Sequence, residues 1–258
     1  MFLPDNIPIL CNLPKDIAYA DIFFLHDVHF GSELFEEQKW KSLKKKIQDN
    51  EFAYVCWIGD IMENAIPNSK SDVFTQKYSP AQQKEWAAQE LFDLRNKTLS
   101  VVAGNHENNR TTKNCGLYPL YDICMLAGVD KKYRDTIAYL DIGVGVAKDK
   151  NKQIHYFGQT QHASREAKNY GFSDFTDGID FYSFGHDHSP VDRPRAKMVF
   201  DAHNKVIYKR NVENINCGSF CSYGGYGAKG AYRPQSDKMY KLRIFGGEKK
   251  METTGFYI

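Results

Sequence analysis

The chain has 258 residues, 42% of them hydrophobic and 26% charged, which is typical of a soluble globular protein. The formal net charge of +2 argues against a strongly basic nucleic-acid-binding protein, although it leaves room for a local basic patch. No apolar run is long enough to span a bilayer, and the first residues lack the charged start and apolar core of a signal peptide. The six cysteines follow no C-x-x-C spacing, which favours reduced thiols. We therefore expect a cytoplasmic protein without a membrane partner.

The first half of the chain predicts strands that alternate with helices. Three short apolar runs are typical of strands buried on both faces, namely residues 21–25, 54–58 and 99–103. Between the first two, Trp40, Leu43 and Ile47 recur at helical spacing among charged residues, which predicts an amphipathic helix. Between the second and third, Ser79 and Pro80 form a helix start signal. This order predicts crossover units in a mainly parallel sheet.

The second half changes character after a helix predicted over residues 118–127. Residues 137–146 and 154–159 flank a polar turn and predict one hairpin, and residues 197–201 and 206–210 predict another. Further strands are predicted over residues 181–184 and, as a pair, within residues 239–258. No internal repeat or low-complexity linker interrupts the chain. We predict a single α/β domain over residues 1–258, with two sheets and a largely antiparallel second half.

Side chains that can bind metal follow four of the predicted strands. They are His26, Asp27 and His29; Asp60; Asn105, His106 and Glu107; and His186, Asp187 and His188. Ligands of α/β sheets bind at the carboxyl ends of strands, so we expect these segments to converge. Imidazole and carboxylate together suit Mn, Fe or Zn rather than Ca. Each motif alone is compatible with an ordinary turn, but four of them at strand ends indicate a metal site.

The series of motifs resembles the calcineurin-like metallophosphoesterases. It consists of D-x-H (Asp27, His29), G-D (Gly59, Asp60), G-N-H-E (residues 104–107), a later histidine and G-H-x-H (residues 185–188). The resemblance implies a four-layer α-β-β-α sandwich of two mixed sheets. It also implies a dinuclear metal site at the carboxyl ends of the strands.

The resemblance assigns a role to each matching residue. One metal would be held by Asp27, His29 and His188, and the other by Asn105, His186 and an intermediate histidine, with Asp60 bridging the two. The expected cofactors are two divalent metal ions, Mn in the first place and Fe or Zn as alternatives. The implied reaction is hydrolysis of a phosphoester by a metal-bound hydroxide. His106 resembles the catalytic histidine of the family, which contacts the phosphate or protonates the leaving oxygen.

The intermediate histidine is either His162 or His155. His155 lies at the start of a predicted strand, whereas His162 lies just past its end. Because the other ligands follow strand ends, we assign His162, although Ala163 stands where the family often has glycine. His155 is then predicted to pack or to face solvent, and His26 to lie in the core or behind a metal ligand.

Weaker features bear on the substrate. The second motif continues as Ile61-Met62-Glu63-Asn64 and lacks the Asp-Arg-Gly extension of the phosphoprotein phosphatases of this superfamily. The overall pattern is more similar to phage and bacterial exonuclease-like members. Three candidate substrate-binding residues are Arg110, Tyr226 and Tyr232. The arginine would reach a phosphate and the tyrosines would stack bases, or else all three belong to ordinary surface loops.

We therefore predict a metal-dependent phosphoric ester hydrolase, namely a phosphodiesterase or nuclease that acts on nucleotides or nucleic acid. The alternatives are a phosphomonoesterase or phosphoprotein phosphatase, and a non-catalytic binding scaffold of the same fold. A scaffold would be expected to have lost some ligands or His106, and none of them is missing from this sequence.

Overall fold

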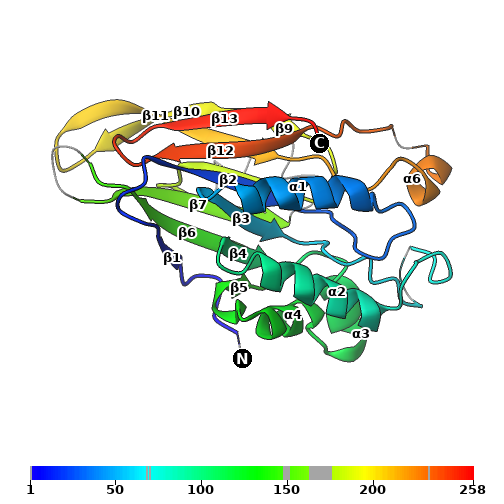
Figure 1. Ribbon diagram of the computed structural model, residues 1–258. Helices are drawn as coiled ribbons and strands as arrows, with labels where there is room; N and C mark the ends of the chain where they lie inside the picture. Colours follow the sequence, from blue (N-terminus) through cyan, green and yellow to red (C-terminus); the bar gives the residue numbers. More distant parts are fainter. Residues whose placement is uncertain (1, 68, 70, 148–151, 163–175, 232) are drawn as a thin grey trace.

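Two mixed β-sheets pack face to face in the structure, a computed structural model that describes residues 2–67, 69, 71–147, 152–162, 176–231 and 233–258 (Figure 1). The first sheet has the order β13-β12-β2-β3-β4-β5. Its strands are β2 (Tyr19–Leu25), β3 (Ala53–Ile58), β4 (Thr98–Val102), β5 (Tyr133–Arg134), β12 (Met239–Phe245) and β13 (Met251–Phe256). Strands β2 to β5 are parallel, as the alternation of apolar runs and helices predicts. The antiparallel strands β12 and β13 extend the sheet beyond β2.

The second sheet has the order β1-β6-β7-β8-β11-β10, and β9 also pairs with β11. Its strands are β1 (Ile9–Asn12), β6 (Ile137–Val144), β7 (Ile154–His162), β8 (Phe181–Gly185), β9 (Val191–Asp192), β10 (Arg195–Asp201) and β11 (Val206–Asn216). Both predicted hairpins are present, as β6–β7 and β10–β11. The second half is largely antiparallel, as predicted, except at the centre of this sheet. Strands β7, β8 and β11 are parallel there. The sequence could not show this, because an apolar pattern predicts a strand but not its direction.

Helices cover the outer side of the first sheet (Figure 1). They are α1 (Glu37–Asp49), α2 (Pro80–Asp93) and α4 (Pro119–Ala127). Helix α1 buries Trp40, whose ring lies 5.6 Å from that of Trp57 on β3. Helix α2 begins at the predicted cap, where Ser79 Oγ accepts a hydrogen bond from Gln82 N and the Gln82 side chain accepts one from Ser79 N. The fourth layer of the predicted sandwich is not among the described residues.

Side chains from both sheets form one apolar core. Phe24 of β2 contacts Phe181 of β8 at 5.9 Å between ring centroids, and both rings are fully buried. Ser100 of β4 and Thr160 of β7 lie 3.4 Å apart through their hydroxyl oxygens in the same layer. Burial of each large apolar side chain contributes about 1.5–3 kcal/mol, so this layer fixes how the two sheets meet. As a result, the carboxyl ends of strands from different sheets are held side by side.

All six cysteines are free thiols. Within the described ranges, no helix is both long enough and apolar enough to cross a membrane.

Candidate metal centre

The ends of five strands from both sheets meet at one edge of the molecule. The predicted ligands lie there: Asp27 and His29 after β2, Asp60 after β3, Asn105 after β4, His162 at the end of β7, and His186 and His188 after β8. Three groups of side chains have ligand atoms within 4.8 Å of one another: Asp27, His29 and His188; Asp60, His162 and His186; and His29, Asp60 and His106. Because the groups share members, they form one continuous cluster.

Unusual backbone conformations turn these side chains back over the strand ends. Positive φ angles, which non-glycine residues rarely adopt, occur at Asp27 (50°), His29 (56°), Asp60 (50°), His186 (92°) and His188 (54°). Each such residue costs on the order of 1 kcal/mol or more, and conformations of this kind concentrate at functional sites. Backbone hydrogen bonds hold the loops in this geometry. Asp27 N donates to Gly59 O at 3.1 Å, and His29 N donates to Asp60 O at 3.0 Å.

The first half of the cluster is built around the buried carboxylate of Asp27. Its Oδ2 accepts hydrogen bonds from His26 Nδ1 at 2.6 Å and from His186 N at 2.8 Å. Its Oδ1 has no hydrogen-bond partner within the part of the chain that the structure describes, yet it is fully buried. This oxygen lies 3.3 Å from His188 Nε2 and 3.9 Å from His29 Nε2. Two ligands of one metal are roughly 3–3.5 Å apart, so a divalent cation between these atoms would satisfy the otherwise unpaired oxygen.

His26 lies behind this carboxylate, as its place in the sequence predicts. Its Nε2 accepts a hydrogen bond from Cys217 N at 2.9 Å, so Nδ1 carries the proton that is donated to Asp27. Such a histidine orients a carboxylate ligand without touching the metal. Burial opposes ionisation of Asp27, but His188 and the other neighbouring histidines outweigh it and hold the pKa of Asp27 well below its ordinary value.

The second half of the cluster is built around His162. Its Nδ1 donates a hydrogen bond to Ile58 O at 2.9 Å, which leaves Nε2 facing the site. That nitrogen lies 3.1 Å from Asp60 Oδ2 and 3.0 Å from Asn105 Oδ1. Burial lowers the pKa of His162, but the charge of Asp60 outweighs burial and raises the pKa to about 10. The position between these atoms therefore attracts positive charge, and the donor set fits a divalent cation.

The two candidate intermediate histidines lie in different places. The His162 ring is 5.2 Å from the His186 ring in the cluster. His155 is exposed, and its Nδ1 lies 2.6 Å from Asp141 Oδ1 on the neighbouring strand β6. His155 is therefore a strand histidine at the surface, outside the cluster.

Asp60 lies between the two halves of the cluster and belongs to two of the three groups. Its Oδ1 accepts a hydrogen bond from His106 N at 2.8 Å, and its Oδ2 faces His162 Nε2 and, at 3.7 Å, His106 Nε2. Burial again opposes ionisation, but the histidines, His106 first, lower the pKa of Asp60 far below its ordinary value. An ionised carboxylate in this place is suited to bridging two cations.

His106 and Arg110 lie together beside Asp60 and Glu63. His106 Nδ1 donates to Glu63 O at 2.8 Å, so its Nε2 accepts the hydrogen bond from Arg110 Nη2 at 2.7 Å. Burial, reinforced by the nearby positive charges, lowers the pKa of His106 to about 4 despite the opposing charge of Asp60. Arg110 also donates to Glu63 O at 2.6 Å and to Ser71 Oγ at 3.1 Å, so it is not a solvated loop arginine.

The two tyrosines predicted to stack bases cannot be placed in this way. Tyr232 lies outside the described residues. Tyr226 belongs to the short helix α6 (Gly225–Lys229), but its side chain is also outside the description. Their predicted roles stay predictions.

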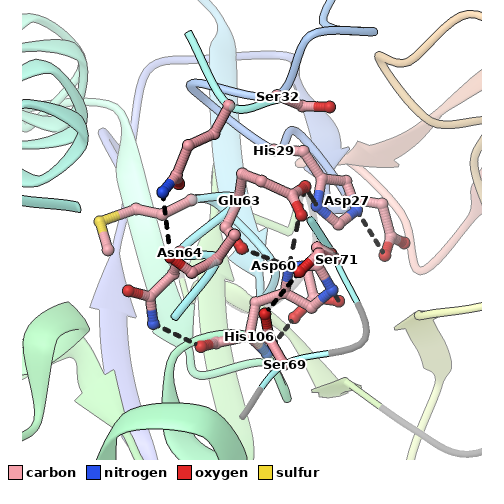
Figure 2. Close-up of polar contacts among 12 residues, drawn as sticks. Asp27, His29, Ser32, Asp60, Glu63, Asn64, Ser69, Ser71 and His106 are labelled. Atoms are coloured by element: carbon pink, nitrogen blue, oxygen red, sulfur yellow. Dashed lines mark hydrogen bonds and ion pairs between the residues drawn. The ribbon is translucent and has the colours of Figure 1, made fainter. Parts of the chain in front are cut away.

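Two glutamates at the centre were not assigned a role from the sequence. Glu63 Oε2 lies 3.2 Å from His29 Nδ1 and 3.9 Å from His106 Nδ1, and Figure 2 shows Glu63 beside both histidines, Asp60 and Ser71. Glu107 is fully buried, and its carboxylate accepts four backbone hydrogen bonds at 2.7–3.0 Å. The donors are the backbone nitrogens of Asp60, Ile61, Met62 and Gly104. Glu107 therefore ties the loop that carries Asp60 to the loop that carries Asn105.

This contact leads to a prediction for Glu107→Gln. The amide nitrogen of glutamine cannot accept the backbone hydrogen bonds made by one of the two carboxylate oxygens. We expect a loss of about 3 kcal/mol in the free energy of unfolding, because two buried hydrogen bonds to a charged group are broken. We also expect weaker Mn²⁺ binding in the fraction that is folded. Urea unfolding and Mn²⁺ titration measure the two effects. The exposed Glu85→Gln on α2 is the control, and equal stability of the two variants would contradict the role of Glu107.

No family model and no curated protein matches the chain. Solved structures similar to it include a conserved uncharacterized protein from Streptococcus pneumoniae, described as a predicted phosphoesterase. That match has a TM-score of 0.38 and 13% identity, and it covers 93% of this chain and 98% of the other. The calcineurin-like phosphoesterase YfkN from Bacillus subtilis has a TM-score of 0.40 and 10% identity, with 93% and 90% covered. Chaetomium thermophilum Vps29 has a TM-score of 0.39 and 10% identity, with 92% and 96% covered. At these TM-scores the likeness is distant.

Proposed function

We propose that the protein is a metal-dependent phosphoesterase with two divalent cations. One cation would be held by Asp27, His29 and His188, the other by Asn105, His162 and His186, with Asp60 between them. The observation that carries this proposal is the arrangement of buried ligand atoms around Asp60. Asp27 Oδ1 has no hydrogen-bond partner among the described residues, and His162 Nε2 faces two oxygens at 3.0–3.1 Å. Both halves would be satisfied by cations.

The two cations and the side chains of the protein would have different roles in the reaction. When bound, two divalent cations neutralise phosphate charge and lower the pKa of a coordinated water. Among the side chains, Asp60 would hold the cations together. His106 Nε2 lies just outside the proposed ligand set, 3.7 Å from Asp60 Oδ2, where it can contact a phosphate oxygen or the leaving oxygen. Arg110 reaches the same nitrogen and is therefore placed to bind the phosphate as well.

We further propose that the substrate is a phosphodiester in a nucleotide or nucleic acid. Asn64 follows Glu63. In the family that the motifs resemble, the phosphoprotein phosphatases have arginine at this position. Asn64 Nδ2 donates to His106 O at 2.6 Å and to Thr111 Oγ1 at 2.7 Å, so it braces the loops and offers the substrate no charge. A diester carries less negative charge than a monoester. The positively charged side chain beside His106 is Arg110, and one arginine suits the smaller charge of a diester better than the larger charge of a monoester.

Hydrolysis of four substrates tests the proposal. With Mn²⁺, Fe²⁺ or Zn²⁺ added, bis-p-nitrophenyl phosphate, cyclic nucleotides or single-stranded DNA should be cleaved faster than p-nitrophenyl phosphate. Faster cleavage of the monoester would overturn the diester proposal and leave the phosphoesterase proposal standing. If metals bind but none of the four substrates is cleaved, the alternative of a non-catalytic scaffold is favoured. The Asp60→Asn variant provides the background rate.

A further inference from the structure

Glu63 is held beside His29 by a short ladder of backbone hydrogen bonds. Phe30 N donates to Ile61 O at 2.8 Å, and Glu63 N donates to Phe30 O at 3.0 Å. Together with the bond from His29 N to Asp60 O, they join the loop after β2 to the loop after β3. The backbone of the two loops therefore brings the side chains of Glu63 and His29 together.

The carboxylate of Glu63 lies on one side of the His29 ring and the proposed metal ligands lie on the other. His29 Nδ1 is 3.2 Å from Glu63 Oε2, whereas His29 Nε2 is 3.9 Å from Asp27 Oδ1. Figure 2 shows His29 between these two carboxylates. Among the described residues, Glu63 belongs to none of the three groups of ligand atoms. Its place is therefore behind a metal ligand, and not among the ligands.

Burial gives this contact its weight. The side chain of His29 is 6% exposed and that of Glu63 is 12% exposed. Neither ring nitrogen of His29 makes a hydrogen bond with good angles to the described residues, although Glu63 Oε2 is within hydrogen-bonding distance of Nδ1. Buried polar atoms need partners. A proton on Nδ1 finds its acceptor in Glu63, and the same tautomer leaves Nε2 free to bind a metal.

The other contacts of Glu63 distinguish its backbone from its side chain. The carbonyl oxygen accepts hydrogen bonds from His106 Nδ1 at 2.8 Å and from Arg110 Nη1 at 2.6 Å. The carboxylate is farther from both, at 3.9 Å from His106 Nδ1 and 3.5 Å from Arg110 Nη1. Ser71 also bonds to the carboxylate and helps to hold it. The groups proposed to contact the substrate thus depend mainly on the carbonyl, which leaves the carboxylate for His29.

We propose that the Glu63 carboxylate is a positioning residue of the metal centre. It accepts the Nδ1–H of His29 and so keeps Nε2 turned toward the cation that His29 would share with Asp27 and His188. This inference rests on the proposed metal-dependent function. Carboxylates that orient a metal-binding histidine are typically worth about 10–100-fold in metal affinity. The effect should be confined to one cation, because His29 is not among the residues proposed to hold the other.

Mn²⁺ titration of Glu63→Ala tests this role by equilibrium dialysis. The unaltered chain should bind two ions, and the variant should bind one of them about 10–100-fold more weakly. The variant keeps the backbone carbonyl, so His106 and Arg110 keep their partner. Glu63→Gln retains an acceptor oxygen without the charge, so it should recover most of the affinity. The exposed Glu85→Ala on α2 is the control and should bind like the unaltered chain.

Two ligand variants identify the cation that Glu63 affects. In His188→Ala the position shared with Asp27 and His29 is already impaired. Adding Glu63→Ala there should change the affinity for the remaining Mn²⁺ by less than about twofold. In His186→Ala the other position is impaired, so adding Glu63→Ala should weaken the remaining Mn²⁺ by about 10–100-fold.

Three results would overturn the inference. Equal weakening of both ions, or a Glu63→Gln variant as weak as Glu63→Ala, would show that only the negative charge of Glu63 matters. Unchanged binding of two ions by Glu63→Ala would remove the inference and leave the proposed function standing. A chain that binds no Mn²⁺, Fe²⁺ or Zn²⁺ would overturn the proposed function itself. Thermal unfolding checks each variant. If Glu63→Ala does not fold, Glu63→Asp replaces it, because the shorter side chain keeps the charge but draws the carboxylate away from His29.

Discussion

Asp60→Asn is expected to abolish phosphoesterase activity and to reduce the bound metal from two ions per chain. The carboxylate lies between the two halves of the cluster, with its Oδ2 at 3.1 Å from His162 Nε2. Asparagine retains the shape but removes the negative charge that holds two cations close together. Loss of metal-based charge stabilisation is worth several kcal/mol, so we expect the rate to fall by about 10³-fold or more. Metal analysis of the purified protein and hydrolysis of bis-p-nitrophenyl phosphate measure the two effects.

The control is Asp122→Asn, which removes an exposed carboxylate of α4 that lies 3.4 Å from Lys84 Nζ. It should leave metal content and rate unchanged. Because Asp60 is buried among histidines, the folding of its variant must be checked by thermal unfolding. A folded Asp60→Asn protein with two metals and full activity would show that Asp60 is not the bridge.

The position of the candidate centre could be predicted because each of its candidate ligands lies next to the end of a strand. Apolar runs identified the strands, and the alternation of strands and helices predicted that β2, β3 and β4 are parallel. Parallel strands place their carboxyl ends at one edge, so Asp27, Asp60 and Asn105 had to converge. His162 could be chosen over His155 by the same reasoning, since one follows a strand and the other begins it.

Apart from His26, the support of the centre could not be predicted, because it consists largely of contacts to the backbone. Glu107 accepts from backbone nitrogens of residues 60–62 and 104, and no side-chain pattern records those partners. Gly104 has a similar role, since a Cβ atom there would collide with the backbone nitrogen of Asp60. The positive φ angles at Asp27, Asp60 and three histidines could not be predicted from the sequence either, because positive φ is expected at glycine and not at these residue types.

The contact between Arg110 and His106, which are four residues apart, could not be predicted because the chain between them is irregular. Arg110 lies in the π-helix Asn108–Thr112, a class of helix that composition does not distinguish from an ordinary one. The sequence therefore left two interpretations of Arg110, and the structure excludes the solvated one through the 2.7 Å contact with His106 Nε2. The direction of β7, β8 and β11 was missed for a related reason, since pairing between distant strands leaves no local pattern.

His106→Ala is expected to retain both metals but to lose most of its turnover. Its Nε2 is turned toward Arg110 rather than held by a ligand partner, and we assign it to the phosphate or the leaving oxygen. Groups that transfer a proton in the transition state contribute roughly 10²–10⁴-fold to the rate, so the loss should lie in that range. The exposed His155→Ala is the matched control, because it removes the same side chain outside the cluster.

A second variant separates catalysis from positioning. His106→Asn retains a side-chain N–H near the place of Nδ1, so it can still donate to Glu63 O, but it has no group in place of Nε2. If Nε2 acts on the substrate, both variants should lose activity to a similar extent while the metal content stays at two. If His106 serves only to hold Glu63 in place, the asparagine variant should recover most of the rate.

His106 also lies within 4.8 Å of His29 and Asp60 through its ligand atoms, which is close enough to contribute to a metal site. Loss of metal in step with loss of activity in both variants would therefore reassign His106 from the substrate to the metal.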